Sequence, residues 1–196
     1  MNDNEIDYDD STHTYTVCGR VVPHVTAILS RMTNYSDIPK AKLEIARQKG
    51  VAVHRMVELD VAGDLDEDGL PEWLRPVLEQ WRKFCTDTGA VVFASERRVY
   101  HPSYQYAGTL DLEVEMRGKR AIVDIKRSLL AGRVIGMQLA AYELASRPPG
   151  KQPARRFALR LHENGPYRLE PFADSRDYND FVTCLAYHKL KQRVIP

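Results

Sequence analysis

The chain has 196 residues, a formal net charge of +1, 43% hydrophobic residues and 28% charged residues. This composition is ordinary for a soluble globular domain, and the near-neutral charge means that any nucleic-acid partner would need a local basic patch. No apolar run approaches the roughly 18 residues of a membrane span, and the acidic N-terminus does not resemble a signal peptide. The cysteines are widely spaced, which argues against a disulfide framework, a zinc site or an iron–sulfur cluster. We infer a reducing, cytoplasmic compartment.

The N-terminal residues predict a small arm. Alternating apolar residues on both sides of Gly19 predict a β-hairpin, and residues 25–29 predict a short helix. Because so small a hairpin is not stable by itself, we expect it to pack on the rest of the chain. We therefore expect an N-terminal hairpin arm with a short helix at 1–38 and a core with a C-terminal helix at 39–196, together forming a single domain.

Two helices are predicted at the start of the core, at residues 39–62 and 71–88, because apolar residues recur there at helical spacing. Gly50 lies on the apolar stripe of the first helix, where it indicates either the close approach of another backbone or a break between two helices. His54 and Glu58 lie one turn apart on the same helix. Taken alone, this pair is more often a histidine at the edge of the core with a solvated glutamate beside it.

The central feature of the sequence is a predicted β-hairpin formed by residues 109–116 and 121–126. A two-residue turn would place Asp111 opposite Asp124, whereas a four-residue turn would place Asp111 opposite Lys126. In either register these three side chains share one face of the hairpin. Carboxylates that face each other across a strand pair repel, and a divalent cation between them would make the arrangement favourable. The pattern predicts a metal site, and an exposed Asp–Lys salt bridge is the alternative.

Mg²⁺ and Mn²⁺ prefer carboxylate and carbonyl oxygens as ligands. Asp111 and Asp124 would supply carboxylates, and the carbonyl group of Ile125 would supply a further oxygen. Lys126 projects beside Asp124, where its ammonium group could lower the pKa of a metal-bound water or stabilise charge on a phosphoryl group. These parts suit phosphodiester hydrolysis.

Further candidate residues lie on two other predicted elements. Residues 91–100 predict a strand, on which Glu96 is either another acidic ligand or a surface partner of an arginine. Residues 132–146 predict a helix, on which Gln138 and Tyr142 stand at i and i+4. A glutamine on an apolar stripe needs a hydrogen-bond partner, which is either nearby backbone or a group in the site. The remaining predicted elements are a second hairpin (156–162 and 167–172) and a C-terminal helix that begins after residues 174–175.

Several ordered motifs resemble those of the PD-(D/E)XK nuclease superfamily, most closely its RecB-like and phage exonuclease branch. In chain order they are Gly50-x-x-x-His54, Glu96, Gly108-Thr109-x-Asp111, Asp124-Ile125-Lys126 and Gln138-x-x-x-Tyr142. The arm residues Asp9, His13 and Tyr15 also resemble the N-terminal arm of phage-encoded members. Together these motifs cover most of the chain.

This resemblance implies an α/β (α+β) fold with a restriction-endonuclease-like αβββαβ core, in which a mixed central sheet is flanked by helices. It implies one or two Mg²⁺ or Mn²⁺ ions and no iron–sulfur cluster. Asp111 and Asp124 would bind metal, and Glu96 and His54 would complete or support the metal shell. Lys126 would act on the attacking water. Three further residues would contact the substrate: Gln138 and Tyr142 of the last motif, and Arg127, which directly follows Lys126.

The function that these features predict is a metal-dependent deoxyribonuclease, an exonuclease of phage or bacterial recombination or repair that acts on double-stranded ends or single strands. A non-catalytic nucleic-acid-binding module on the same fold is one alternative, and an endonuclease of the resolvase or restriction type is another. Besides DNA, the expected partners are a single-strand annealing protein and a second copy of the chain, and no membrane. The expected location is the cytoplasm of a bacterium or of a phage-infected host.

Overall fold

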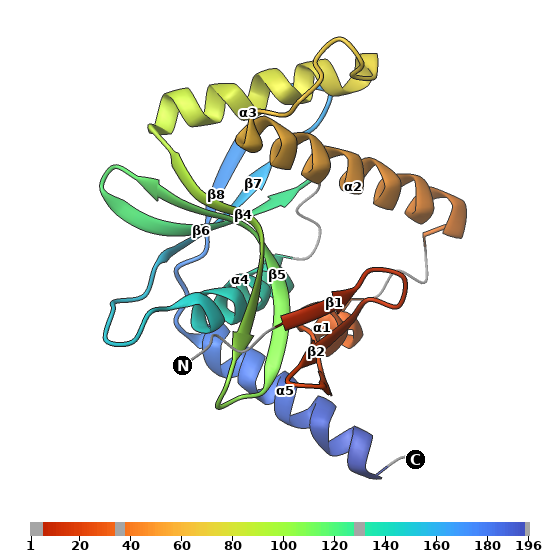
Figure 1. The fold of residues 1–196 in the computed structure, drawn as a ribbon, viewed down its shortest axis with the longest axis vertical. Coiled ribbons are helices and arrows are strands. Elements are labelled where there is room, and N and C mark those ends of the chain that lie inside the picture. Colours follow the sequence, from red (N-terminus) through yellow and green to blue (C-terminus); the bar gives the residue numbers. More distant parts are fainter. Residues whose placement is uncertain (1–5, 34–37, 128–131, 195–196) are drawn as a thin grey trace.

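The computed structural model of this chain describes residues 6–33, 38–127 and 132–194. Its centre is a five-stranded mixed sheet with the strand order β4-β5-β6-β7-β8 (Figure 1). Neighbouring strands are antiparallel except β6 and β7, which are parallel and are separated in the chain by a helix. The predicted αβββαβ order and mixed sheet are confirmed. The strands are β4 (Val91–His101), β5 (Tyr106–Met116), β6 (Lys119–Lys126), β7 (Arg155–Arg160) and β8 (Arg168–Pro171).

Helices cover both faces of the sheet because its central strands are apolar on both faces. On one face α2 (Lys40–Ala62) and α3 (Arg75–Thr88), which follows the short η2 (Glu72–Leu74), pack against Leu112 and Val123. On the other face α4 (Gly132–Ser146) and α5 (Arg176–Val194) pack against Leu110 and Ile122. The expected connection at 128–131 lies outside the described residues. No helix within the described ranges is both long enough and apolar enough to cross a membrane.

The turn between β5 and β6 sets the register of the central hairpin. It consists of Arg117 and Gly118, which both have positive φ angles, 53° and 70°. Two consecutive positive φ angles are typical of the tight turns that match the twist of antiparallel strands. The paired positions run from Met116–Lys119 to Leu112–Val123. Of the two turn lengths that the sequence left open, the two-residue turn is therefore correct and the four-residue turn is wrong.

The N-terminal arm is a three-stranded antiparallel sheet rather than a simple hairpin. Its second and third strands turn at Gly19 as expected, and residues 6–9 add a strand at the edge. The arm packs on the beginning of β5, where Tyr15 Oη lies 2.8 Å from Thr109 Oγ1 and the Ala107 N–H donates to the Pro23 carbonyl at 3.0 Å. Its elements are β1 (Ile6–Asp9), β2 (Thr14–Val17), β3 (Arg20–Val22), α1 (Val25–Leu29) and η1 (Ser30–Met32).

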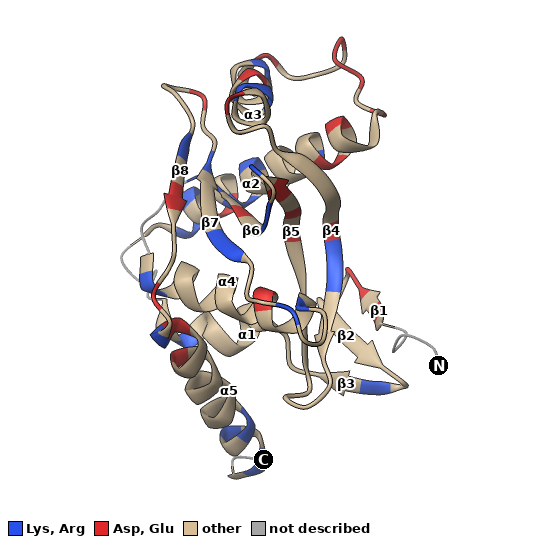
Figure 2. Cartoon of the chain, turned by 90° about the vertical axis from the view of Figure 1, so that its left-hand side faces the viewer, with Lys and Arg blue, Asp and Glu red and all other residues tan. Residues whose placement is uncertain are grey.

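Two expectations for α2 are wrong. The helix continues through Gly50, and a Cβ atom placed there would meet nothing within 4 Å, so neither a break nor a close backbone contact explains this glycine. Glu58 does not bind His54; its carboxylate accepts a hydrogen bond from Arg55 at 2.6 Å. After α2 the chain enters a loop with a run of acidic positions (Figure 2), where Asp64 and Glu67 are exposed.

Candidate metal centre

The candidate site begins where β5 and β6 stop pairing. The last pair of the ladder is Leu112–Val123, one residue before Asp111 and Asp124. Beyond it, side chains bind the backbone of Ile125: its N–H donates to Asp111 Oδ2 at 2.6 Å, and its carbonyl oxygen lies 3.2 Å from His54 Nε2. Buried backbone groups need such partners. The end of the ladder therefore fixes both Asp111 and His54.

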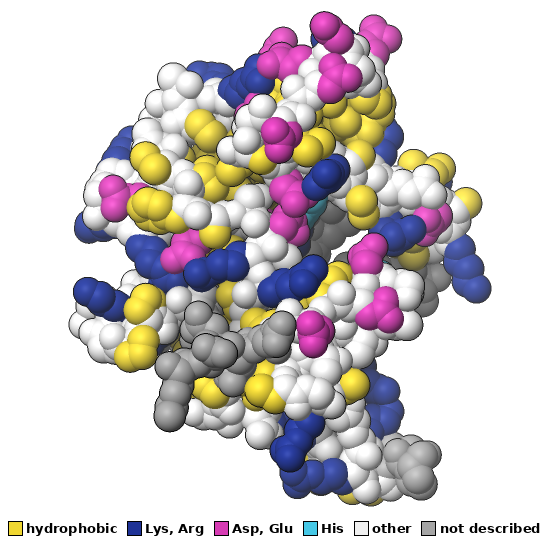
Figure 3. Space-filling view, viewed as in Figure 1, with side chains coloured by type: hydrophobic (Ala, Val, Ile, Leu, Met, Phe, Trp, Pro, Cys, Tyr) yellow, Lys and Arg dark blue, Asp and Glu magenta, His cyan; other side chains and the backbone are white. Residues whose placement is uncertain are grey.

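Three side chains offer ligand atoms to one point. Atoms of His54, Glu96 and Asp111 all lie within 4.8 Å of one another. His54 Nδ1 is 3.1 Å from Glu96 Oε1 and 3.7 Å from Asp111 Oδ1. The β4–β5 pairs on either side place Glu96 opposite Asp111. Figure 3 shows a histidine in a recess of the surface beside acidic side chains. The two carboxylates and the nearby Ile125 carbonyl are oxygen donors that suit Mg²⁺ or Mn²⁺, and His54 adds an imidazole nitrogen beside them.

Glu96 reaches this position through an unusual backbone conformation. Its φ angle is 48°, a region that residues other than glycine seldom adopt. The β4–β5 register also shifts between Val92 and Ala94, earlier in the same strand. Bulges and positive φ angles redirect side chains and occur often at functional sites. The irregular strand is thus associated with a carboxylate that contacts α2.

Asp124 lies beside the group of three but is not a member of it. Its side chain is 1% exposed, and its Oδ2 is 2.7 Å from Lys126 Nζ. Its Oδ1 is buried and has no hydrogen-bond partner among the described residues. Burial raises the pKa of Asp124 to about 6, although the Lys126 ammonium limits the rise. A buried carboxylate oxygen without a donor fits a nearby cation, so the residues present are compatible with a metal.

The charge state of His54 is set by the acceptors around it. Burial lowers its pKa, but the carboxylates of Asp111 and Glu96 outweigh this effect and raise the pKa to about 9. Both ring nitrogens face oxygen atoms, which is the arrangement that an imidazolium prefers. His54 would have to release a proton before it could bind a metal ion.

Tyr142 and Gln138 lie behind the carboxylates. Tyr142 is buried, and its hydroxyl accepts a hydrogen bond from Gln138 Nε2 at 3.2 Å. Burial, and then the charges of Asp111 and Asp124, raise the pKa of Tyr142. The ring also lies against Gly108, where a Cβ atom would be 2.8 Å from Tyr142 Cε1. The Tyr142 ring therefore connects two of the sequence motifs: it packs against Gly108 of one and is hydrogen-bonded to Gln138 of the other.

The resemblance assigns Arg127 to substrate binding. In the structure its side chain contacts other residues of the chain. Its Nη2 lies 3.1 Å from Glu163 Oε1, and the same oxygen is 2.6 Å from Lys49 Nζ. Both cations lie over the ring of Trp73, at 5.9 Å and 4.9 Å from its centre. Sequence reasoning finds neither Glu163 nor Trp73, because Lys49 and Glu163 are 114 positions apart in the chain.

The fold and the site together define a mixed α/β protein with a candidate divalent-metal centre at the end of its central hairpin. No protein-family model matches the chain, and no curated protein matches it. Among solved structures, an alkaline exonuclease (LHK-Exo) from Laribacter hongkongensis is similar, with a TM-score of 0.46 and 13% sequence identity. The similarity covers 87% of this chain and 87% of that chain. So distant a likeness carries no argument about function, which must come from the residues of the site.

Proposed function

We propose that this chain is a metal-dependent nuclease of the PD-(D/E)XK superfamily that hydrolyses phosphodiester bonds in DNA. The observation that carries the proposal is the convergence of His54, Glu96 and Asp111 within 4.8 Å, next to the buried Asp124 and the Lys126 ammonium that pairs with it. These are the residues that the ordered motifs single out. They come from α2, β4, β5 and β6, so the fold assembles them from distant parts of the chain.

His54, Glu96, Asp111 and the Ile125 carbonyl would hold Mg²⁺ or Mn²⁺, with Asp124 beside them. When bound, such an ion polarises a phosphoryl oxygen and lowers the pKa of bound water. Lys126 places an ammonium group 2.7 Å from Asp124 Oδ2, where it can orient the attacking water and stabilise charge that develops on the phosphate. Asp111 keeps Oδ1 directed at the site because Oδ2 is held by the Ile125 N–H.

DNA would approach along the exposed first half of α2, which extends beyond the sheet (Figure 1). Lys40 and Lys42 lie on this half and have no ion pair among the described residues, so they are candidates for phosphate contacts. Gln138 and Tyr142 would support the carboxylates and the strand that lies against them. We further propose that cleavage begins at a strand end and serves recombination or repair, which the resemblance of the ordered motifs to the phage exonuclease branch supports.

The experiment compares linear duplex, single-stranded and covalently closed circular DNA, each with Mg²⁺, with Mn²⁺ and with EDTA. The wild-type chain should degrade linear DNA only with a divalent ion and should leave the closed circle intact. Asp124→Asn should lose this activity while it remains folded by circular dichroism. Asp64→Asn removes the same charge from the exposed loop after α2 and should cleave like the wild type.

Each alternative gives a different result. An endonuclease would nick the closed circle. A non-catalytic binding module would retain DNA on a filter or in a gel without metal-dependent turnover by any variant. Undiminished cleavage by Asp124→Asn would show that the metal site has been assigned to the wrong residues.

A further inference from the structure

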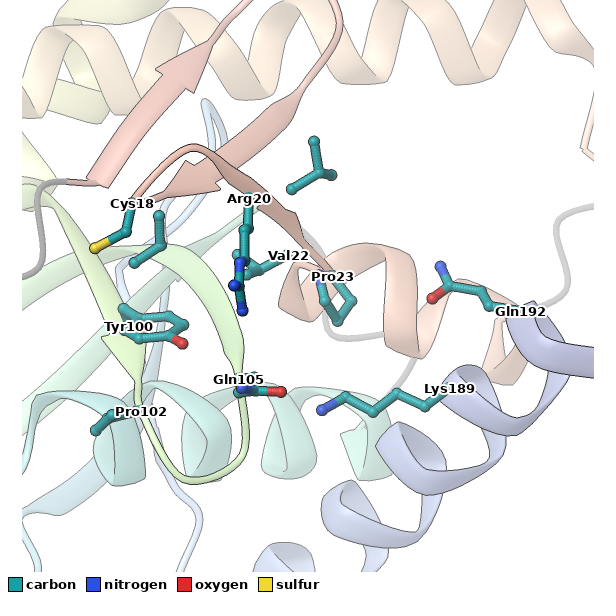
Figure 4. A pocket seen from close by; sticks show the side chains of 11 residues that line it. Cys18, Arg20, Val22, Pro23, Tyr100, Pro102, Gln105, Lys189 and Gln192 are labelled. Carbon is teal, nitrogen blue, oxygen red and sulfur yellow. The ribbon is translucent and has the colours of Figure 1, made fainter.

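A pocket lies between the arm, the β4–β5 hairpin and α5, away from the candidate metal centre. Its volume is about 470 Å³, within the range of roughly 300–1,000 Å³ that small-molecule sites occupy. Val22 and Pro23 of the arm line it together with Tyr100 at the end of β4. Figure 4 shows Arg20 reaching in from the arm and Lys189 reaching in from α5, with Gln105 between their charged ends.

The pocket is positively charged. None of the described residues that line it is acidic, and neither Arg20 nor Lys189 has an ion pair within the described part of the chain. Lys189 Nζ donates to the Tyr104 carbonyl at 2.7 Å, which fixes its ammonium group at the wall of the pocket. In Figure 2 the basic positions of β3 and of the last turns of α5 lie at the same end of the molecule. Two cations that converge without a carboxylate favour an anionic ligand.

The other lining groups narrow the class of anion. Tyr100 is half-buried and offers an aromatic surface, and Gln105 offers an amide that can both donate and accept hydrogen bonds. Aromatic faces stack on nucleobases, whereas lysine and arginine bind phosphate. We propose that this pocket binds a nucleoside phosphate, with Arg20 and Lys189 on the phosphate and Tyr100 against the base.

This ligand could be one nucleotide of a DNA strand that is held at the metal centre or a free nucleotide. Gln105 directly precedes β5, and the strand runs from Tyr106 to Asp111 over roughly 17 Å at about 3.4 Å per residue. DNA rises about 3.4 Å per base pair, so the pocket lies on the order of five base steps from the centre. A DNA strand that reached the pocket would be bound at two places, the pocket and the metal centre. That the ligand belongs to a DNA strand rests on the proposed function. That the pocket binds a nucleoside phosphate does not.

The test is equilibrium binding in EDTA, where no cleavage occurs, so a failure of the nuclease proposal would not affect it. The probes are a short fluorescent single-stranded oligonucleotide and deoxythymidine monophosphate. Arg20→Gln/Lys189→Gln removes two charges from the pocket, and Arg75→Gln/Lys83→Gln removes two charges from α3 at the other end of the molecule (Figure 1). Tyr100→Leu tests stacking. Thermal unfolding checks that every variant is folded.

We expect the pocket variant to bind the oligonucleotide about tenfold more weakly than the α3 variant, with a shallower dependence on salt. Tyr100→Leu should weaken binding at high salt as well, because stacking is not screened. Loss of the mononucleotide alone, with unchanged oligonucleotide binding, would support the pocket with a free nucleotide as its ligand. Equal affinities of the pocket and α3 variants for both probes would overturn the proposal.

Discussion

Asp111 and Ile125 are joined by a hydrogen bond at the point where strand pairing ends, with the Ile125 N–H donating to Asp111 Oδ2 at 2.6 Å. The other carboxylate oxygen, Oδ1, lies 3.7 Å from His54 Nδ1. The two oxygens of one side chain therefore have different tasks, since one holds the strand and the other faces the candidate metal site. A substitution that keeps the first oxygen and changes the second separates these tasks.

Asp111→Asn should remain folded and lose metal binding. Its amide oxygen can accept the Ile125 N–H bond, which leaves an NH₂ group facing His54, and an amide nitrogen does not bind Mn²⁺. We expect the affinity for Mn²⁺ to fall roughly 100-fold, as when a metal site loses a key interaction. Isothermal titration calorimetry measures the affinity, with Asp64→Asn as the charge-matched control. Equal Mn²⁺ affinities in the two variants would remove Asp111 from the metal site.

Lys126→Met should separate metal binding from cleavage. Methionine keeps much of the length of the side chain and removes the ammonium group that lies 2.7 Å from Asp124 Oδ2. A nearby positive charge repels a metal ion, so Mn²⁺ affinity should be unchanged or higher, whereas cleavage should fall about 100-fold or more. Lys119→Met, at the exposed start of the same strand, is the control. Similar cleavage rates in both variants would contradict a chemical role for Lys126.

The two glycines of the sequence motifs should respond in opposite ways to alanine. At Gly108 the new Cβ atom would lie 2.8 Å from Tyr142 Cε1 and 3.1 Å from Val25 Cγ2, so Gly108→Ala should destabilise the fold by about 1–3 kcal/mol. At Gly50 the helix has room, and alanine is the better helix former, so Gly50→Ala should stabilise it by up to about 1 kcal/mol. Urea unfolding measures both. A neutral Gly108→Ala would mean that Tyr142 is not held against β5.

Local rules predicted much of the site, and long-range contacts supplied the rest. The turn at Arg117 and Gly118 is encoded by neighbouring residues, so the sequence could place Asp111 and Asp124 next to each other on adjacent strands. The positive φ of Glu96 and its contact with His54 could not be predicted, because the two residues are 42 positions apart in the chain. The motifs assign Arg127 to the substrate, and its pairing with Glu163 could not be predicted because it depends on how the β7–β8 loop folds back.

The edge strand of the arm was missed for a related reason. Residues 6–9 alternate apolar and acidic residues over only four positions, too few to predict a strand, and they become one by pairing with residues 14–17. Helix positions were predictable because periodic apolar residues extend over many turns. The end of the β5–β6 ladder had no such signal, although it creates the site. A pattern within one helix or strand can be predicted from the sequence. A site that forms where several elements meet can be predicted only in part.

His24 should make the stability of the fold depend on pH. Its ring nitrogen Nδ1 accepts the Ala27 N–H at 3.4 Å at the start of α1, and burial lowers its pKa below the ordinary value of about 6.5. Above that value the ring is neutral in both states. As the pH falls through it, the unfolded chain binds a proton that the folded chain resists, so stability is lost. Asparagine can cap the helix without titrating.

His24→Asn should therefore lose less stability than the wild type between pH 7 and pH 5. Urea unfolding at a series of pH values measures this difference. The remaining histidines titrate in both proteins, and the charges of His13 and His188 add to the lowering of the His24 pKa. Parallel pH profiles would show that the His24 ring is not held in its neutral form.

Glu163 binds the two cations that flank Trp73, with Oε1 at 2.6 Å from Lys49 Nζ and 3.1 Å from Arg127 Nη2. Arg127 directly follows Lys126, so this cluster adjoins the candidate site. A DNA phosphate that bound Lys49 or Arg127 would have to compete with the carboxylate. The glutamate would then weaken binding in the free protein.

Glu163→Gln should bind duplex DNA more tightly, by roughly three- to tenfold at low salt, because glutamine keeps the shape and removes the competing charge. The gain should shrink at high salt, and adding Arg127→Gln should abolish it. Glu67→Gln is the matched control, because Glu67 is also an ion-paired glutamate, 2.7 Å from Arg82 on α3. Fluorescence anisotropy in EDTA measures all four affinities. If Glu163→Gln binds no more tightly than Glu67→Gln, Lys49 and Arg127 hold the β7–β8 loop against α2 and do not contact DNA.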